Sequence, residues 1–510
     1  MSATRRTSQS LRNSISVSAL ALAIAMASPA QAQSDSSNVQ GHVDGVRAGT
    51  QVVAVDTNTG QRAVGVVDAK GNYAIFGLRP STYRVSIDGK GAQDATVLVG
   101  QTAVVDFTTT PQTDSGKEIV VTGRVQREVR TQSVSTNITT AQILNLPQNQ
   151  RNFLSFAALA PGVALSSPSG ATQVQAGGTA ASNVNVLLDG MSLKNSINHG
   201  GVFGQNFGLG NPFPQIAIQE YKVETQNFGA ETGQVGSALI TAITKTGGAH
   251  FHGSAFIEFQ PKSFIGQPYF DKQNHVPKPT YSRKQFGGEL SGPIIPGRLT
   301  FYVGGEGTIE KLPATTGNVQ GPFPASLLSQ VNIPHNFDFK QGLYFGKLSF
   351  FANDQNTVNL SAFVRRENNL ADIDGNAAPT HGRTILTHEN RYQVNWKHSN
   401  GDFLNQLNMA YDKATQSTPS VGTGPEFLVS GNFATAAPCA AAFPDAASQQ
   451  YTSCVANGGN ADFGSAVQLG TNSFEQGDVQ KSYTFKDDAT WRRGEHTLKF
   501  GGQLAFLDLA

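Results

Sequence analysis

The chain has 510 residues and a formal net charge of +1, and only 14% of its residues are charged, while 54 are glycine. A chain of this length has room for several domains. The low charge content and a mean hydropathy of −0.25 are untypical of a cytosolic α/β enzyme and favour many polar strands separated by glycine turns. Lysine and arginine are scattered along the chain, so no nucleic-acid partner is expected.

Residues 1–32 have the pattern of a secretory signal peptide. A basic region precedes an apolar run at 17–27, which is too short to span a membrane. The small-residue pattern Ala30-Gln-Ala32 follows, so the mature chain is expected to begin at Gln33. The basic residues are Arg5, Arg6 and Arg12.

Residues 33–109 are expected to form a small β-sandwich, because short apolar runs alternate with turn signals such as Asn58-Thr-Gly60. Two motifs, Asp68-Ala-Lys-Gly71-Asn-Tyr73 and Leu78-Arg-Pro80-Ser-Thr-Tyr83-Arg-Val85, resemble the carboxypeptidase regulatory-like module. That module has no catalytic residues. The alternative is a generic immunoglobulin-like sandwich.

Residues 110–123 are predicted to be a polar linker that ends in a β-prone hexapeptide. An exposed extended segment with free backbone groups can add a strand to another protein's sheet. The hexapeptide resembles a TonB box, the segment with which outer-membrane receptors engage the periplasmic protein TonB. The alternative is an ordinary strand at a domain edge. Its residues are Glu118, Ile119, Val120, Val121, Thr122 and Gly123.

Residues 124–249 resemble the plug domain of TonB-dependent outer-membrane receptors. Three blocks carry the resemblance: Leu159-Ala-Pro-Gly-Val163, Asn185-Val-Leu-Leu-Asp-Gly190 and Ile243-Thr-Lys-Thr-Gly-Gly248. One departure is Gln234, where many relatives have arginine. A plug–barrel ion pair at that position is therefore not expected.

Residues 250–510 are predicted to supply the N-terminal part of a β-barrel. About nine segments approach the 9–11 residues that a tilted membrane strand requires, and several alternate apolar and polar residues. Short turns join some of them, and long connections at 309–340 and 415–479 join others. The segments are 250–260, 282–292, 298–308, 341–352, 356–367, 389–399, 402–414, 480–492 and 495–507.

Two stretches, Gln285 to Ile294 and Phe301 to Glu306, resemble hallmarks of the Oar-like branch of these receptors. The implied fold is mainly β: a small β-sandwich, an α+β plug domain, and part of a 22-stranded antiparallel transmembrane β-barrel. The sequence stops at Ala510 without the terminal aromatic residue usual in this class. We therefore expect a truncated sequence or fragment, because an open barrel leaves strand edges unsatisfied in lipid.

No catalytic motif is found in the sequence, so an enzyme, a cofactor or a metal site is not expected. A periplasmic carbohydrate-active enzyme remains an alternative, although plug motifs argue against it. Cys439 and Cys454 are the two cysteines, and in an exported chain we expect them to pair. Closing this loop contributes about 3 kcal/mol in the chain-entropy model; metal binding is the weaker alternative, without a CxxC pattern.

Ligand contacts are predicted in the plug stretch 196–213, which is rich in glycine, asparagine and aromatic residues. Glycine permits close backbone approach, and aromatic rings stack on sugars or flat ligands. The alternative is an apical loop without dedicated contacts. The candidate residues are His199, Phe203, Asn206, Phe207 and Phe213.

The resemblance implies active import of a scarce nutrient across the outer membrane: a siderophore, an oligosaccharide or a peptide. Implied partners are TonB with its inner-membrane energising complex, outer-membrane lipid, the barrel assembly machinery and the nutrient. The sandwich and the TonB box are expected in the periplasm. The rival interpretations are an Oar-like structural or adhesion protein and a non-functional receptor fragment.

Overall fold

The fold is described from a computed structural model of the chain. It covers residues 37–87, 91–107, 134–148, 150–166, 172–197, 202, 210–267, 269–273, 278, 280–313, 325–331, 335–373, 377–430, 465–472, 475–493 and 496–510. Among these residues, no helix is both long and apolar enough to cross a membrane.

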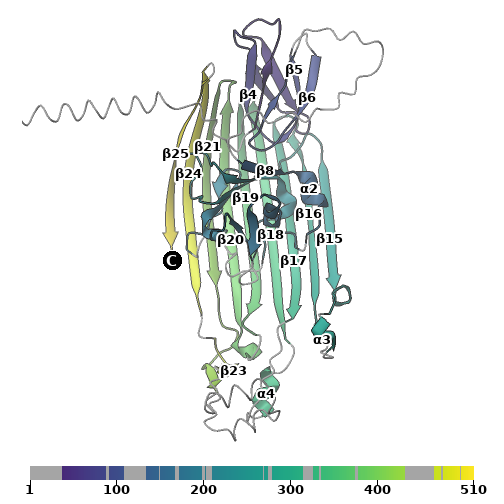
Figure 1. Ribbon diagram of the computed structural model, residues 1–510, viewed down its shortest axis with the longest axis vertical. Helices are drawn as coiled ribbons and strands as arrows, with labels where there is room; N and C mark the ends of the chain where they lie inside the picture. Colours follow the sequence, from purple (N-terminus) through teal and green to yellow (C-terminus); the bar gives the residue numbers. More distant parts are fainter. Residues whose placement is uncertain are drawn as a thin grey trace, which may run out of the picture.

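A nine-stranded antiparallel sheet, here called the wall, forms the largest part of the molecule (Figure 1). Each strand pairs with its neighbours in chain order, which makes the sheet part of a barrel. In the described residues the first and last strands of this order are β15 and β25. The strands are β15 (His252–Pro261), β16 (Ser282–Ile295), β17 (Leu299–Pro313), β18 (Asn336–Asn353), β19 (Asn356–Ala371), β20 (Arg383–Ser399), β21 (Phe403–Ser417), β24 (Gly477–Arg493) and β25 (His496–Leu509).

All nine predicted strands are present, but most are longer than expected. β18 has 18 residues and β20 has 17, whereas the prediction took the 9–11 residues that cross the hydrocarbon. The extra residues lie mostly at the ends that carry the long connections. They stay in the sheet because each one still pairs with a residue of the adjacent strand, for example Phe339 with Asn369.

The two faces of the wall differ in polarity, because side chains alternate along each strand. On β19, Phe363, Arg365 and Glu367 are almost completely buried toward the interior. Leu360 on the opposite face is 47% exposed. A polar inner face and an apolar outer face are the arrangement of a membrane barrel.

The plug lies against the inner face of the wall (Figure 1). Its five-stranded mixed sheet has the order β12-β11-β14-β13-β8, with β11 and β14 parallel. Its hydrophobic core is continuous with the wall residues Tyr302, Phe345 and Phe363. The strands are β8 (Val134–Ile138), β11 (Val184–Leu188), β12 (Met191–Ser192), β13 (Ile218–Gln226) and β14 (Ala238–Thr244), with the separate pair β9 (Val163–Ser166) and β10 (Gln173–Ala176).

Short helices complete the plug. Helix α2 (Thr140–Asn145) begins with a capping box between Thr139 and Gln142, which satisfies backbone donors at its N-terminus. Three 3-10 helices are also present: η1 (Phe153–Leu159), η2 (Ala181–Asn183) and η3 (Gln215–Ala217).

Residues 37–107 form a two-sheet module with its own apolar core, which includes Val39, Val52, Tyr73 and Val85. We call it the N-terminal module. One sheet has the order β4-β1-β7 and the other β3-β2-β5-β6. The strands are β1 (Ser37–His42), β2 (Gln51–Asp56), β3 (Arg62–Val66), β4 (Asn72–Leu78), β5 (Ser81–Ile87), β6 (Gly91–Val97) and β7 (Thr102–Val104). Its assignment as a carboxypeptidase regulatory-like domain, and the domain boundaries given above, stay predictions.

The wall has a short-turn end and a long-connection end. Turns such as Asn353–Asn356 lie at the end where the N-terminal module sits, at the top of Figure 1. The opposite end carries α3 (Tyr269–Gln273), α4 (Ala325–Val331), β22 (Phe427–Ser430) and β23 (Ser465–Leu469), with η4 (Lys262–Phe264) and η5 (Pro379–His381). Short turns at one end and long loops at the other are typical of outer-membrane barrels.

Candidate functional site

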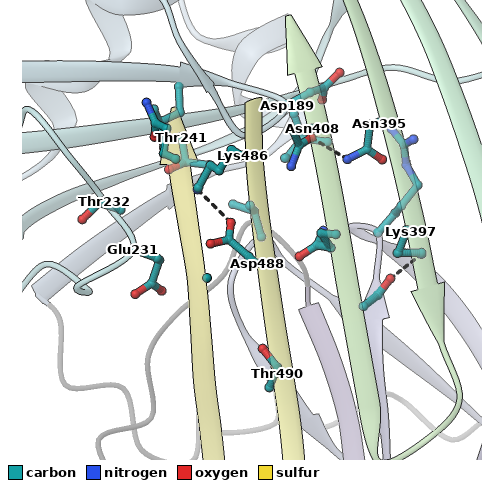
Figure 2. Close-up of a pocket in the computed structure, with 18 of the residues that line it drawn as sticks. Asp189, Glu231, Thr232, Thr241, Asn395, Lys397, Asn408, Lys486, Asp488 and Thr490 are labelled. Atoms are coloured by element: carbon teal, nitrogen blue, oxygen red, sulfur yellow. Dashed lines mark hydrogen bonds and ion pairs between the residues drawn. The ribbon is translucent and has the colours of Figure 1, made fainter. Parts of the chain in front are cut away.

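A cavity of about 580 Å³ lies where the plug, the N-terminal module and the inner face of the wall meet. Figure 2 shows that its polar side chains come from several elements that are distant in the sequence. Asp189 comes from the turn after β11, Glu231 from the connection between β13 and β14, and Lys486 from β24. Arg79 of the N-terminal module also lines the cavity, so polar side chains from all three parts face one space.

Lysine residues in this cavity are matched by acidic groups or carbonyl oxygens. Lys486 Nζ lies 3.0 Å from an Asp488 carboxylate oxygen, and Lys499 Nζ lies 3.3 Å from Glu231 of the plug. Lys397 donates to the carbonyl of Gly77 in the N-terminal module. Figure 2 marks the first and third of these contacts. The cavity therefore presents both basic and acidic side chains, several of which already pair with one another.

Asp189 is the central contact between plug and wall. Its carboxylate accepts from the backbone N–H and the hydroxyl of Thr244, and it lies 2.7 Å from Lys347 Nζ on β18. Burial alone would raise its pKa, but the positive charges of Lys347 and Arg79 outweigh burial and hold the pKa below its usual value. The N-x-x-L-D-G motif thus places an ionised carboxylate against a buried wall lysine.

The backbone of this turn has an unusual conformation. Asp189 has a φ of 45° and Gly190 a φ of 86°, in the left-handed region where Asp is tolerated and glycine is unstrained. The Asp189 backbone carbonyl accepts a hydrogen bond from Gln393 Nε2 at 2.8 Å. The turn therefore presents both its side chain and its backbone to the wall.

Further ion pairs join plug and wall along other strands. Arg151 lies 3.2 Å from both Glu258 and Glu306, and its guanidinium stands over the Phe256 ring. Lys245 lies 2.8 Å from Glu289. Removing one partner from a buried pair leaves an uncompensated charge and costs about 3–5 kcal/mol. These pairs fix the orientation of the plug at several points.

At position 234 no ion pair was expected, and the structure describes only a backbone contact there: the Gln234 carbonyl accepts from Lys194 Nζ at 2.6 Å. The plug–wall pairs instead use Arg151, Lys245 and Asp189. Asp189 and Lys245 stand in the plug motifs quoted above, but the motifs did not assign them this role. The signal that was available is a set of charged residues at inward positions of the wall strands, such as Glu289, Glu306 and Lys347.

Phe213 is the one predicted ligand contact among the described residues. It is fully buried, with ring centroids 5.1 Å from Phe345 and 4.9 Å from Phe363 on the wall. In this conformation it belongs to the plug–wall core, and its role as a ligand contact stays a prediction. His199, Phe203, Asn206 and Phe207 lie outside the described residues, as do the signal peptide, the hexapeptide 118–123 and both cysteines.

The N-terminal module reaches the plug and the wall through residues 76–81, which we call the wedge turn. Arg79 donates to the Thr244 carbonyl of the plug at 2.9 Å, and Gln219 of the plug donates to the Pro80 carbonyl at 2.5 Å. Ser399 of the wall donates to the Phe76 carbonyl at 2.9 Å. One turn therefore touches both the plug and the wall, an arrangement that sequence reasoning missed.

A second contact between the module and the plug involves Glu220 on β13. Its Oε1 accepts from the Val99 backbone N–H at 3.0 Å and from Asn137 Nδ2 at 3.1 Å. Burial raises its pKa to about 7, and these two hydrogen bonds only partly offset that effect. The contact therefore changes its protonation near neutral pH.

Metal binding finds no support in the described residues, where no group of three or more His, Cys, Asp or Glu side chains gathers. The chemistry available is reversible binding through hydrogen bonds and ion pairs.

The geometry defines a class of protein: a plugged outer-membrane β-barrel.

Comparison with known proteins supports this class and narrows it. A family model described as an outer membrane beta barrel domain matches residues 243–344. The TonB-dependent transporter Oar of Myxococcus xanthus is 24% identical over 271 residues, which is 50% of this chain and 24% of Oar. The chain is therefore an outer-membrane protein whose sequence is similar to part of a TonB-dependent transporter. The curated relative is described as a transporter, not as an enzyme.

One solved structure shows the same fold. The outer membrane transporter YddB from Escherichia coli is 12% identical with a TM-score of 0.53, over 75% of this chain and 50% of that chain. The siderophore receptor PirA from Acinetobacter baumannii is 18% identical with a TM-score of 0.49, over 73% and 48% of the two chains. The chain thus spans about half the length of these structures.

Proposed function

We propose that the protein actively imports a scarce nutrient across the outer membrane, and that TonB, driven by its inner-membrane complex, gates the plug. The observation that carries the proposal is the plug's attachment to the wall through separate ion pairs, such as Asp189 with Lys347 and Lys245 with Glu289. Such contacts fix a closed position, yet each can re-form after a displacement because the wall partner of each pair stays on an ordered strand.

TonB is proposed to pair with residues 118–123, which lie between the N-terminal module and the plug in the sequence. A β-prone segment can be added to the edge of a partner's sheet through backbone hydrogen bonds. The module, at the short-turn end of the wall, supports a periplasmic location for this segment. We further propose that the barrel assembly machinery inserts the protein and that lipid surrounds the apolar outer face.

The nutrient classes are an iron–siderophore complex, an oligosaccharide and a peptide. The basic and acidic side chains that line the cavity can form hydrogen bonds with the polar groups that all three classes carry. A panel of these three classes, supplied as sole iron, carbon or nitrogen source to cells that depend on this protein, identifies the class that supports growth.

The deciding experiment replaces Val120 with proline in the protein expressed from its native locus. Proline has no backbone N–H and breaks strand pairing, so uptake is expected to fall to the level of a strain without TonB. The matched control is Gln112→Pro, in the predicted polar linker outside the hexapeptide; the levels of both variant proteins in the membrane must be compared first. Uptake that survives both Val120→Pro and loss of the proton gradient would instead support the structural or adhesion role.

A further inference from the structure

The N-terminal module forms one boundary of the cavity of about 580 Å³ described above. It lies at the short-turn end of the wall (Figure 1). Gly77, Leu78, Arg79 and Pro80 of the wedge turn line the cavity together with Val99, which belongs to the turn between β6 and β7. The rest of the lining comes from the plug and from inner-face residues of the wall. The docked module therefore stands between the cavity and the short-turn end.

The module is also seated on the wall at points outside the wedge turn. Gln61 Nε2 donates to Thr357 Oγ1 of β19 at 2.8 Å. The Asn58 carbonyl accepts from the backbone N–H of Ala249, where the chain passes from plug to wall, at 2.9 Å. A Cβ at Gly248 would lie 2.9 Å from Asn58 Oδ1, so the chains approach closely there. Together with the wedge turn, these contacts hold the module on the wall and at the junction between wall and plug.

Asn137 on β8 joins the module to the plug. Its Nδ2 donates to the Val99 carbonyl at 3.2 Å and to Glu220 Oε1 at 3.1 Å, and its Oδ1 accepts from Gln101 Nε2 at 3.2 Å. Asn137 keeps this position because β8 pairs with β13, where Asn137 stands opposite Lys222. One plug side chain therefore connects the module with two strands of the plug sheet.

Strand β8 occupies the edge of the plug sheet. It has five residues, and among the described strands it pairs with β13 alone. An edge strand has a partner on one side, so β8 can separate from β13 while the other strands stay paired. In the sequence, β8 is the first described strand after the module, and residues 118–123 lie between the two. A force on residues 118–123 therefore acts on the C-terminal end of the module and on β8 at the same time.

We propose that the N-terminal module is an exit gate for the cavity. While docked, the module closes the cavity toward the short-turn end; when β8 is drawn away from β13, Asn137 leaves Val99 and Gln101, and the module is released. The proposal rests on the proposed function, which supplies the force on residues 118–123 and takes the short-turn end as periplasmic. Asn137 is a positioning residue, because it acts by holding the module and does not contact a solute. A solute that has passed the plug then leaves the cavity only after the same pull has opened the gate.

The first test measures access to the cavity in the purified protein, expressed from its native locus. Asn395 of β20, a lining residue labelled in Figure 2, is replaced by cysteine, and the probe is a sulfonated fluorescent maleimide. Labelling of Asn395→Cys should be slow compared with labelling of Arg298→Cys, an exposed position at the short-turn end. The wild-type protein under the same conditions gives the background from Cys439 and Cys454.

Two variants weaken the docked state from different sides. Asn137→Ala removes the plug's hydrogen bonds to the module's turn between β6 and β7. Gly77→Ala introduces a Cβ that would lie 2.6 Å from Leu404 Cδ1 of the wall. Each variant should raise the labelling rate of Asn395→Cys about 5- to 100-fold, because the module is then undocked for a correspondingly larger fraction of the time.

Asn145→Ala is the matched control for Asn137→Ala. Asn145 is an exposed asparagine of the plug, and its side chain donates to the Ala141 carbonyl within the same helix. This variant should leave the labelling rate of Asn395→Cys unchanged. Labelling of Arg298→Cys should be the same with and without each substitution, which separates release of the module from a general loss of fold.

The second test uses living cells and measures whether the pull opens the gate. Labelling of Asn395→Cys by the same maleimide is compared in strains with and without TonB. TonB should raise the labelling rate, and Val120→Pro should remove this increase. In Asn137→Ala the module is no longer held by β8, so labelling should be fast with or without TonB. A merely structural role for Asn137 would change the rate but not its dependence on TonB.

Each contrary outcome overturns a defined statement. If Asn395→Cys reacts as fast as Arg298→Cys, or if Asn137→Ala and Gly77→Ala both leave its rate unchanged, the docked module does not close the cavity. If labelling in cells is the same with and without TonB, the pull does not open the gate. Uptake of the nutrient-panel compounds in the same strains distinguishes the two failures. Uptake that needs TonB while labelling does not would leave the proposed function standing without the gate, and uptake independent of TonB would overturn the proposed function as well.

Discussion

The plug has two interfaces of different chemistry. Toward the wall it is held by ion pairs between side chains, such as Asp189 with Lys347 and Arg151 with Glu306. Toward the N-terminal module it is held by two hydrogen bonds with the wedge turn, from Arg79 to the Thr244 carbonyl and from Gln219 to the Pro80 carbonyl, and by the buried Glu220. The first interface therefore depends on matched charges, and the second depends on the backbone shape of one turn and on the protonation of one carboxyl group.

The largest expected effect comes from breaking a matched charge. Asp189→Asn keeps a residue that tolerates the φ of 45° but leaves the buried Lys347 without its counter-charge. Loss of about 3–5 kcal/mol in plug stability is expected, measured by denaturant unfolding of the plug. The double variant Asp189→Asn/Lys347→Met removes both charges and should recover most of that loss. A single variant as stable as the wild type would show that charge matching is not what holds this interface.

The second effect is a pH dependence confined to the module interface. The raised pKa of Glu220, about 7 instead of 4.5, means that the docked state binds the proton more tightly than the undocked state. Docking is therefore strongest below pH 4.5, weakens as pH rises toward 7, and is constant above it. The change is on the order of 3 kcal/mol.

Hydrogen exchange of the Val99 amide, which donates to Glu220, measures this docking between pH 5 and 8. The quantity compared is the protection of the Val99 amide, that is, its exchange rate relative to the intrinsic rate at the same pH. Glu220→Gln should abolish the pH dependence of this protection, whereas Asp94→Asn, on the exposed surface of the module, should preserve it. An unchanged slope in Glu220→Gln would assign the pH dependence to another group.

The third prediction tests the shape of the wedge turn. Gly77 has a φ of 75°, and a Cβ there would lie 2.6 Å from Leu404 Cδ1 of the wall. Gly77→Ala should weaken docking by about 1–3 kcal/mol. Gly60→Ala is a matched control, because Gly60 has a φ of 74° and open space around it; both carry backbone strain, but only Gly77→Ala meets the wall. Equal Val99 exchange rates in the two variants would contradict the idea that docking depends on the close contact of the wedge turn with the wall.

The smallest effect concerns the surface ion pair between module and wall. Arg62 and Asp354 lie 4.0 Å apart with both side chains about half exposed, and such pairs contribute less than about 1 kcal/mol. Asp354→Asn should leave Val99 exchange unchanged at low and high salt. A clear loss of docking would mean that charge also matters at this interface.

The sequence predicted the wall better than it predicted the contacts. Alternating runs identified all nine strands because one face meets lipid and the other a polar interior, and this alternation is written into each strand. The sequence pattern underestimated the lengths of the strands. The polar ends that extend beyond the membrane no longer alternate with apolar residues, yet they keep their backbone pairing, as in β18.

The candidate site was predicted only in part. The motif Asn185 to Gly190 was quoted as part of the plug resemblance, but Lys347, the partner of Asp189, lies 158 residues further along the chain. Phe213 was expected to meet ligand because it is aromatic and near glycines, and its burial against Phe345 and Phe363 follows from the docking of plug on wall. The pairing of Arg79 with Thr244 likewise depends on where the module sits.

By itself, the sequence determined the class of this protein, because strand alternation and turn motifs are local patterns that survive in any tertiary context. Tertiary structure decided which charged residues are neutralised, which aromatic residues are buried, and that Glu220 titrates near neutral pH. Those properties arise from desolvation and from charges brought together across hundreds of residues. Burial and distance of this kind are properties of the folded chain and cannot be read from neighbouring positions in the sequence.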